Sequence, residues 1–311
     1  LTGNALVGSF TKEQVLEKEA KNRLVGQGFC EIYTYSFETP KAFELLNIPL
    51  DSKLREAVTI LNPLGQDMSV MRTSPLFGML STLSNNEKKR AKSAYLFEIG
   101  KTYRNQQGSE LPFEPKNITI GAFGDGCDFF HIKGVVIETL KVFGIKDAEF
   151  TADSENTSFH PYKTAKITFQ GVEIGIIGQI HPIVQENFSL SKETYAAILD
   201  LTKLLSIEIP AVKYKALNKF PSSEKDFSVV VDDSVTVADI EKTAKKVAGS
   251  MLTSISLFDV YRGNQIPEGK KSVSFSFVLE DYTKTLTDEE TNGMLNKIIE
   301  GIIKEHHAEL R

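Results

Sequence analysis

Hydrogen-bonding and aromatic side chains recur at alternate positions in two segments near the end of the sequence. In SVSFSF (272–277), three serines point to one side of a strand, and the valine and phenylalanines point to the other. In the preceding segment, Asp259 and Tyr261 are two positions apart and share a side. A small, polar row of this kind suits a sheet face left open for a ligand to lie on. The alternative is a solvated surface, because half-exposed antiparallel sheets are common.

Sequence motifs for catalysis, nucleotide binding or metal binding are scarce. The sequence contains no P-loop, no G-x-G-x-x-G after a strand, no H-E-x-x-H and no G-x-S-x-G. None of its histidines forms a pair with metal-ligand spacing: His131, His160, His181, His306 and His307. His160 and His181 each precede a proline, so we expect them to hydrogen-bond the backbone at turns. We predict no catalytic residue and no metal site.

Arginine is absent between Arg104 and Arg262. Enzymes that handle ATP or another phosphorylated substrate usually hold the phosphates with fixed guanidinium groups. The larger, first part of the chain offers few candidates, namely Arg72 and Arg104, with Lys101 beside the latter. The gap argues against a phosphate-dependent enzyme.

The composition is that of an ordinary soluble globular protein long enough for two domains, with 311 residues, 41% hydrophobic and 25% charged. Net charge is −5, and residues 213–311 hold 14 Lys and Arg against 16 Asp and Glu. Any contact with nucleic acid must therefore be local and shape-specific, because no basic excess supports electrostatic adhesion. There is no apolar run long enough to cross a membrane.

The ends and the cysteines give a further expectation. The chain begins Leu1-Thr2-Gly3, without an initiator Met or a signal-peptide pattern, as expected for a piece of a longer polypeptide. Cys30 and Cys127 lie far apart and match no metal or redox spacing, so we expect reduced thiols in a cytoplasmic protein.

The first part of the chain is predicted to be a strand-rich sheet with a few helices. Thr11 and Gln14 form a capping box for a helix over 12–25, and Ser74 and Pro75 open another over 72–86. Apolar periodicity predicts a further helix at 130–143, and a short one is expected at 40–46. Strands are predicted at 29–37, 56–63, 93–105 (with a bend at Gly100), 117–125, 164–170, 172–180 and 194–201.

A change in composition marks the domain boundary. Segment 206–226 has two prolines and no clear period, and we place the linker at 208–218, between domains 1–207 and 219–311. After it the order is strand 226–232, helix 236–248, strands 252–262 and 271–280, helix 287–305 and strand 308–311. This β-α-β-β-α-β order is the ferredoxin-like arrangement.

Ordered segments along the whole chain resemble the bacterial phenylalanyl-tRNA synthetase beta subunit. They include GFCEIYTYSF (28–37), LNPLGQDMSVMRTSPLFGMLSTLSNN (61–86), YLFEIGKTYRN (95–105) and IGIIGQIHP (174–182). In the second domain they include KFPSSEKDFSVVVDD (219–233), LFDVYRG (257–263), EGKKSVSFSF (268–277) and TLTDEETN (285–292). The family's subunit is much longer, and this chain is similar to its C-terminal portion.

For the first domain, the resemblance implies a catalytic-like domain with the antiparallel sheet of class II synthetases, so the whole chain is expected to be α+β. In the family this domain does not activate phenylalanine but packs on the catalytic alpha subunit in an (αβ)₂ heterotetramer. Arg104 could be a relic of the motif-two arginine, and nothing after it in this domain could serve as the motif-three arginine. The resemblance thus implies a scaffold that binds no cofactor, within a ligase that uses ATP and Mg²⁺ to attach phenylalanine to its tRNA.

For the second domain, the resemblance implies a ferredoxin-fold anticodon-binding domain, in which the polar face is a platform for unstacked bases. Tyr261 would stack on a base and Asp259 would accept from a base amino group. The residues expected to contact the anticodon are Ser228, Asp259, Tyr261, Ser272, Ser274 and Arg311. Candidate phosphate contacts are Lys219, Lys225, Arg262, Lys270 and Lys271.

One departure from the family pattern and several alternative interpretations bear on the second domain. Glu224 stands where the family often has a basic residue, so no phosphate contact is expected there. Asp259 could instead pair structurally with Arg262, and Lys270 and Lys271 could guard an exposed strand. From a different class, the second domain could be an ACT-like module that senses a free amino acid, although its loop 232–236, DDSVT, has two acids and no glycine.

Overall fold

The computed structural model describes residues 8–106, 108–210, 213–214, 216–263 and 265–311. The chain divides into two compact units, residues 1–211 (unit 1) and 212–311 (unit 2). The division falls inside the segment that the sequence marks as a linker. None of the helices in these described ranges is both long and apolar enough to span a membrane.

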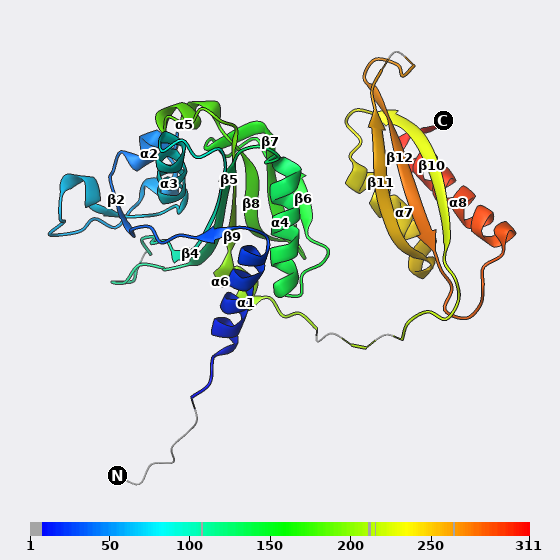
Figure 1. Cartoon of the computed structure of the whole chain (residues 1–311), viewed down its shortest axis with the longest axis horizontal. Coiled ribbons are helices and arrows are strands. Elements are labelled where there is room, and N and C mark those ends of the chain that lie inside the picture. Colours follow the sequence, from blue (N-terminus) through cyan, green and yellow to red (C-terminus); the bar gives the residue numbers. More distant parts are fainter. Residues whose placement is uncertain (1–7, 107, 211–212, 215, 264) are drawn as a thin grey trace, which may run out of the picture. The chain divides into compact units, whose positions relative to one another are not determined.

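A seven-stranded sheet forms the centre of unit 1, with the order β1-β4-β5-β9-β8-β7-β6 (Figure 1). All neighbouring strands are antiparallel except β1 and β4. The strands are β1 (Cys30–Glu31), β4 (Ala94–Lys101), β5 (Lys116–Phe123), β6 (Glu149–Ala152), β7 (Phe159–Phe169), β8 (Val172–Ile180) and β9 (Thr194–Asp200). A separate short pair joins β2 (Phe37–Glu38) to β3 (Val70–Met71).

Helices cover the two faces of this sheet unequally. One face packs on α1 (Lys12–Gly26), α4 (Phe129–Val142) and α6 (Leu201–Ser206) through a continuous apolar core. The other face packs on α2 (Ala42–Leu45), α3 (Leu76–Lys88) and α5 (Pro182–Asn187) over only part of its area. The remaining part of that face carries polar side chains. Short 3₁₀ turns occur at Lys53–Arg55, Gln66–Met68 and, in unit 2, Gly249–Met251.

Two predicted strands of unit 1 are largely wrong. Segment 29–37 contributes only the two-residue strands β1 and the start of β2. The chain leaves the sheet because Thr34 donates its backbone N–H and its hydroxyl to the Glu98 carboxylate, at 3.2 and 2.7 Å, instead of to a neighbouring strand. Segment 56–63 forms no strand, and its pairing is limited to an isolated bridge between Thr59 and Val70.

Unit 2 has the predicted β-α-β-β-α-β order. Its four-stranded antiparallel sheet runs β11-β12-β10-β13, and both helices lie on the same side of it (Figure 1). The elements are β10 (Ser223–Asp232), α7 (Val237–Ala248), β11 (Leu252–Tyr261), β12 (Lys270–Leu279), α8 (Asp288–His306) and β13 (Glu309–Leu310). Capping boxes at Thr236 and Thr287 begin the two helices.

The core of unit 2 lies between the sheet and the two helices. Val273, Phe275 and Phe277 on β12 are fully buried there, packed against apolar side chains of α7 and α8. The Phe227 ring on β10 packs on the rings of Phe275 and Phe277, at centroid distances of 5.9 and 4.9 Å. This row anchors the central strands, so that the alternate residues must point away from the helices.

Candidate nucleic-acid interface

The strand register of unit 2 brings the predicted hydrogen-bonding residues onto one face. Tyr261 lies opposite Ser272, and Asp259 lies opposite Ser274, which in turn lies opposite Ser228 on β10. Directly opposed residues of antiparallel strands point to the same side of the sheet. We call the side away from the helices the serine face, defined by Ser228, Asp259, Tyr261, Ser272, Ser274 and Ser276.

A bulge in β11 is needed to build this face. Leu257 pairs with the buried Phe275, yet Asp259, two residues later, pairs with Ser274 on the opposite side. The register shifts between these positions, and Phe258 is the extra residue. Without the bulge, strict alternation would turn Asp259 and Tyr261 towards the helices. The shared side of these two residues follows from their spacing, but which side they face does not.

The centre of the serine face is covered, contrary to the expectation of an open surface. Ser272 is only 1% exposed and Ser274 7% exposed. Arg311 donates its backbone N–H to the Ser228 carbonyl at 3.0 Å, and its guanidinium carbon lies 5.2 Å from the centre of the Tyr261 ring. The Arg311 Nη2 also donates to Gln265 Oε1 at 3.1 Å.

Most hydroxyls of the serine face already have a partner. The Ser228 and Ser274 hydroxyls lie 2.8 Å apart, and Ser276 donates to Glu224 Oε1 at 2.7 Å. Ser272 Oγ is buried and has no hydrogen-bond partner among the described residues. Among the described residues it is a buried hydroxyl of this face with unused bonding capacity, and burying an unpaired hydroxyl costs about 1–3 kcal/mol.

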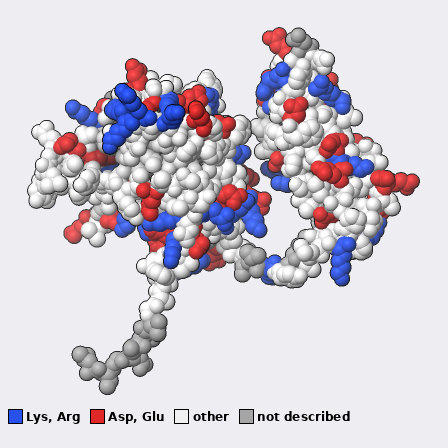
Figure 2. Space-filling view, viewed as in Figure 1, with Lys and Arg blue, Asp and Glu red and all other residues white. Residues whose placement is uncertain are grey.

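Carboxylates outnumber cations around this face. The strand register places five acids and two bases on its side of the sheet: Glu224, Asp226, Asp232, Asp259 and Glu309, with Lys270 and Arg311. Charges of both signs also alternate over the visible surfaces of both units (Figure 2). A surface rich in acceptors favours partners that offer N–H donors, such as the amino groups of bases, and repels phosphates.

The five candidate phosphate contacts lie in different surroundings. Lys219 is exposed, Arg262 Nε pairs with Asp233 at 3.1 Å, and Lys270 pairs with Glu309 at 2.6 Å. That carboxylate raises the pKa of Lys270. Lys225 and Lys271 face the helices instead. Lys225 lies opposite the buried Phe277 and reaches Asp288 of α8 at 3.6 Å.

Lys271 is the least suited of these to meet a phosphate. It lies opposite the buried Val231, and its Nζ donates to the Asp233 carbonyl at 2.9 Å. Burial and, to a smaller extent, the nearby Arg262 lower the pKa of Lys271. Its ammonium group is thus held on the helix side of the sheet, away from the serine face.

Unit 1 has a second polar sheet face, defined by Glu98, Asn117, Thr119 and Asp200. Arg72 lies on it, and its Nη1 is 3.0 and 3.2 Å from the two Glu98 carboxylate oxygens. Both side chains are 3% exposed. Arg72 also donates to Thr34 Oγ1 at 2.8 Å and to the Lys101 carbonyl at 2.7 Å. The Arg72 guanidinium is thus engaged by hydrogen bonds and an ion pair within unit 1.

Gly100 makes room for this ion pair. A Cβ at this position would lie 2.2 Å from Arg72 Nη2, which no side chain could tolerate. The pairing of β4 with β5 continues through Gly100 without a register shift, so Gly100 marks a close approach of Arg72 to the strand and not the predicted bend.

Glu38 adds a second buried carboxyl beside Arg72. Burial raises the pKa of Glu38 to about 8, although the Arg72 charge and a hydrogen bond with the Thr73 backbone act in the opposite direction. Arg72 is ion-paired with Glu98, and the neutral form of Glu38 avoids a second buried negative charge near that pair.

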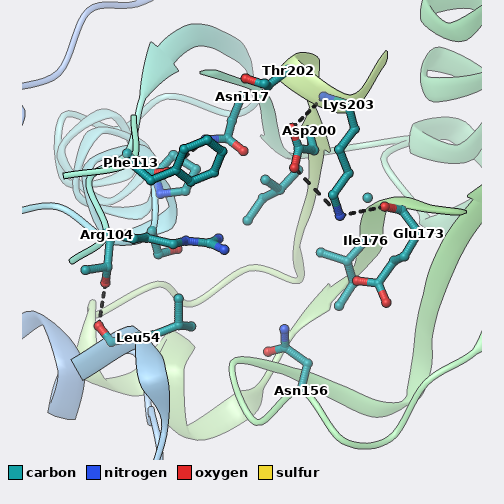
Figure 3. A pocket seen from close by; sticks show the side chains of 16 residues that line it. Leu54, Arg104, Phe113, Asn117, Asn156, Glu173, Ile176, Asp200, Thr202 and Lys203 are labelled. Carbon is teal, nitrogen blue, oxygen red and sulfur yellow. Dashed lines mark hydrogen bonds and ion pairs between the residues drawn. The ribbon is translucent and has the colours of Figure 1, made fainter. Parts of the chain in front are cut away.

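A cavity of about 320 Å³ lies on the same face of the unit 1 sheet, where Asn117 and Asp200 are among its lining residues (Figure 3). Arg104 extends into it from the side of Phe113, and Asp200, Lys203 and Glu173 lie across from it. Asp200 accepts from the Lys203 backbone N–H at 2.9 Å, and Lys203 Nζ donates to the Glu173 carbonyl at 2.8 Å. Among the described residues that line the cavity, Arg104 is the single arginine.

His160 and His181 hydrogen-bond the backbone at turns, as the sequence predicts for these two residues. His160 Nδ1 accepts from the Tyr162 N–H at 3.1 Å, and His181 Nδ1 accepts from the Ile183 N–H at 3.2 Å. Within the described ranges, no three His, Cys, Asp or Glu side chains are grouped as metal ligands would be. Burial raises the pKa of the Cys127 thiol to about 12, which makes it a poor nucleophile.

Comparison with known proteins first defines a class. The crystal structure of pyrrolysyl-tRNA synthetase from Desulfitobacterium hafniense superimposes with a TM-score of 0.53 at 20% sequence identity, over 62% of this chain and 68% of that protein. With its large antiparallel sheet and its ferredoxin-like unit, the chain has the α+β fold expected of a class II aminoacyl-tRNA synthetase with an added domain.

The family follows from sequence models and relatives. Residues 2–201 match the phenylalanyl tRNA synthetase beta chain CLM domain, and residues 218–311 match the ferredoxin-fold anticodon binding domain. The phenylalanine–tRNA ligase beta subunits of Clostridium acetobutylicum and Clostridium tetani are 41% and 40% identical over 97% of this chain. The chain belongs to the phenylalanyl-tRNA synthetase beta chain family. It spans 38% of the length of these two relatives.

Proposed function

We propose that unit 2 reads the anticodon of phenylalanine tRNA on the serine face. The observation that carries the proposal is the register of three strands, which together with the bulge at Phe258 gathers Asp259, Tyr261 and Ser272 on the side away from the helices. An aromatic ring for stacking beside a carboxylate and an unpaired hydroxyl suits a base with exposed amino groups. The match to an anticodon-binding family model supports the same assignment.

The remaining predicted residues have graded roles in this proposal. Ser228 and Ser274 must first break their mutual hydrogen bond to contact a base. Lys219, Arg262 and Lys270 are the cations that can meet the RNA backbone at the rim of the face. Lys225 and Lys271 lie towards the helices, and we leave them out.

For unit 1 we propose a non-catalytic scaffold in a phenylalanine–tRNA ligase that uses ATP and Mg²⁺. The internal use of Arg72, and a cavity lined by one arginine among the described residues, support this assignment. The partner would be an alpha subunit, in an (αβ)₂ arrangement, since the relatives are beta subunits. Gel filtration of the chain with and without an alpha subunit tests this part, and separate elution at micromolar concentration would oppose it.

The anticodon proposal is tested with fluorescent phenylalanine tRNA transcripts carrying native and altered anticodons, at one stated low salt concentration. Replacing Tyr261 by Ala removes the stacking ring, so we expect the chain to lose about tenfold or more in affinity for the native anticodon. Its preference over altered anticodons should disappear. Tyr162→Ala is the matched control, because Tyr162 is an exposed tyrosine of unit 1. Equal affinity of the unaltered chain for all anticodons would contradict the proposal.

A further inference from the structure

A run of basic residues follows the end of α3 in unit 1. Lys88, Lys89 and Arg90 are consecutive, and Lys92 comes two residues later. No other three consecutive Lys or Arg residues occur in the sequence. All four side chains are exposed, and none of them has an ion pair or a side-chain hydrogen bond among the described residues. We call these four residues the basic loop, and it presents four positive charges that no described carboxylate neutralises.

The carboxylates nearest in sequence and packing are engaged elsewhere. Glu87 accepts from the Ser191 backbone N–H at 3.0 Å and from the Ser191 hydroxyl at 2.6 Å. Glu193, in the segment before β9 that contacts the basic loop, accepts from the Tyr195 hydroxyl at 2.8 Å and lies 3.5 Å from Lys163 Nζ. The charge of the basic loop therefore remains available to a partner.

The backbone of the basic loop is held in place by the same segment. Lys192 Nζ donates to the carbonyls of Ala91 and Lys92 at 3.1 and 2.5 Å. The bonds between Glu87 and Ser191 fasten the last turn of α3 to this segment as well. Because the backbone is already ordered, a partner that binds here has less conformational entropy to remove.

Arg90 has a conformation that favours glycine. Its φ is 65°, in the left-handed region. Its N–H donates to the Glu87 carbonyl at 2.8 Å, and the Ala91 N–H donates to the Asn86 carbonyl at 3.1 Å, which is the Schellman pattern of a helix end. A cation can also interact with the helix dipole, but Lys88 does so from the last turn without strain. The strained arginine points to a role for its charge outside the fold.

We propose that the basic loop contacts the sugar–phosphate backbone of the tRNA whose anticodon unit 2 reads. This inference rests on the proposed function of unit 2. The serine face has more carboxylates than cations around it, so it supplies little attraction for phosphates, and the basic loop supplies this attraction instead. Contacts with phosphates position a nucleic acid without reading its sequence. The basic loop thus adds affinity for tRNA but no preference for an anticodon.

The contact is tested with the whole chain and fluorescent full-length phenylalanine tRNA, at salt concentrations from 50 to 200 mM. One variant combines Lys88→Gln, Lys89→Gln and Lys92→Gln. It should bind about tenfold or more weakly at the lowest salt concentration, and the slope of log affinity against log salt should fall by about two to three, as expected for three lost phosphate contacts. The loss should be equal for native and altered anticodons.

The matched control combines Lys41→Gln, Lys53→Gln and Lys146→Gln. These exposed lysines of unit 1 also lack an ion pair among the residues that the structure describes, so the control loses the same charge from other places. It should bind tRNA as the unaltered chain does. Equal losses of affinity in the two triple variants would show that net charge alone matters, and would overturn the inference.

Arg90→Gly separates an RNA contact from a role in the fold. Glycine suits the left-handed conformation, so the urea midpoint of unit 1 should stay unchanged or rise. Binding of tRNA should nevertheless weaken, with a salt slope lower by about one. A lower urea midpoint together with unchanged tRNA affinity would show that Arg90 serves the fold, and would remove it from the contact.

The same measurements separate this inference from the proposed function. If the unaltered chain prefers the native anticodon but the basic-loop variants bind as the control does, the anticodon function stands and the backbone contact does not. If all anticodons bind equally while these variants lose affinity, the anticodon function fails and the backbone contact stands. Absence of tRNA binding by the unaltered chain would contradict both. Loss of binding to an alpha subunit, with unchanged tRNA affinity, would make the basic loop a protein contact and overturn the inference.

Discussion

Each unit of this chain has a polar sheet face on which an arginine lies, but the two arginines are held differently. Arg72 in unit 1 is buried and paired with Glu98 at 3.0 Å, over a glycine that leaves it room. Arg311 in unit 2 rests on an aromatic ring at the surface, with a neutral acceptor as its other contact. Breaking a buried ion pair is costly, whereas an exposed cation–π contact is weak. The same side chain thus serves as a buried ion-pair partner in unit 1 and as an exposed cation–π partner in unit 2.

Arg72→Met should have the largest effect of the substitutions that test this contrast. It leaves Glu98 charged and buried, so we expect the free energy of unfolding of unit 1 to fall by about 3–5 kcal/mol. Urea unfolding followed by hydrogen exchange, with peptides assigned to each unit, measures the loss and shows whether unit 2 is unaffected.

The matched control is Arg23→Ala, which breaks the exposed Arg23–Glu138 pair, 3.4 Å long, and should cost less than about 1 kcal/mol. Adding Glu98→Gln to Arg72→Met should recover part of the loss. A fall below about 1 kcal/mol for Arg72→Met would remove the distinction between the two arginines.

A pH dependence should also separate the units. Burial raises the pKa of Glu38 to about 8, above its ordinary value of 4.5, so the folded chain binds more protons than the unfolded chain between these values. This contribution to stability is fully present below about pH 4.5 and is lost as pH rises towards 8, by up to about 1.4 kcal/mol per pH unit.

Glu38→Gln keeps the neutral shape at every pH, so its stability relative to the unaltered chain should increase steadily from pH 5.5 to 8. Urea unfolding at several pH values measures this difference. Unit 2 should show no such trend, because the carboxylates of its serine face are exposed. A constant difference between the two chains would mean that Glu38 is charged at neutral pH.

One buried, unpaired hydroxyl from the described part of each unit gives the smallest and most specific comparison. Thr119 Oγ1 in unit 1 and Ser272 Oγ in unit 2 are both buried without a hydrogen-bond partner. Thr119→Val and Ser272→Ala should each raise stability by about 1 kcal/mol, because each removes an unsatisfied polar group. Only Ser272→Ala should weaken RNA binding. Equal RNA affinity of the two variants would show that the Ser272 hydroxyl has no part in recognition.

The sequence was most informative where structure is determined locally. Thr236 and Thr287 open the helices of unit 2 with capping boxes, and the alternation in residues 272–277 correctly separates the core side of β12 from the polar side. Alternation also indicates where Lys271 points, because it shares its side with Val273. The same alternation predicts that Lys271 points towards the helices, so it is a poor candidate for a phosphate contact on the serine face.

Long-range contacts account for what could not be predicted. Thr34 leaves its expected strand to bind Glu98, 64 residues later, and Arg311 makes a cation–π contact with the Tyr261 ring, 50 residues earlier. One signal for the buried ion pair was present, since Glu98 interrupts the apolar strand YLFEIG and a buried charge needs a partner. Neither the arginine that pairs with Glu98 nor the contact between Arg311 and Tyr261 can be predicted from a local sequence pattern.

The excess of carboxylates around the serine face has a kinetic consequence. On the proposed function, this surface repels the polyanion whose bases it reads, so an RNA that makes no specific contact leaves quickly. Complexes of unit 2 with unrelated RNA are then short-lived, so they do not delay binding of the cognate anticodon loop. On the proposed function, unit 2 therefore holds an RNA for long only where the bases make specific contacts with the serine face.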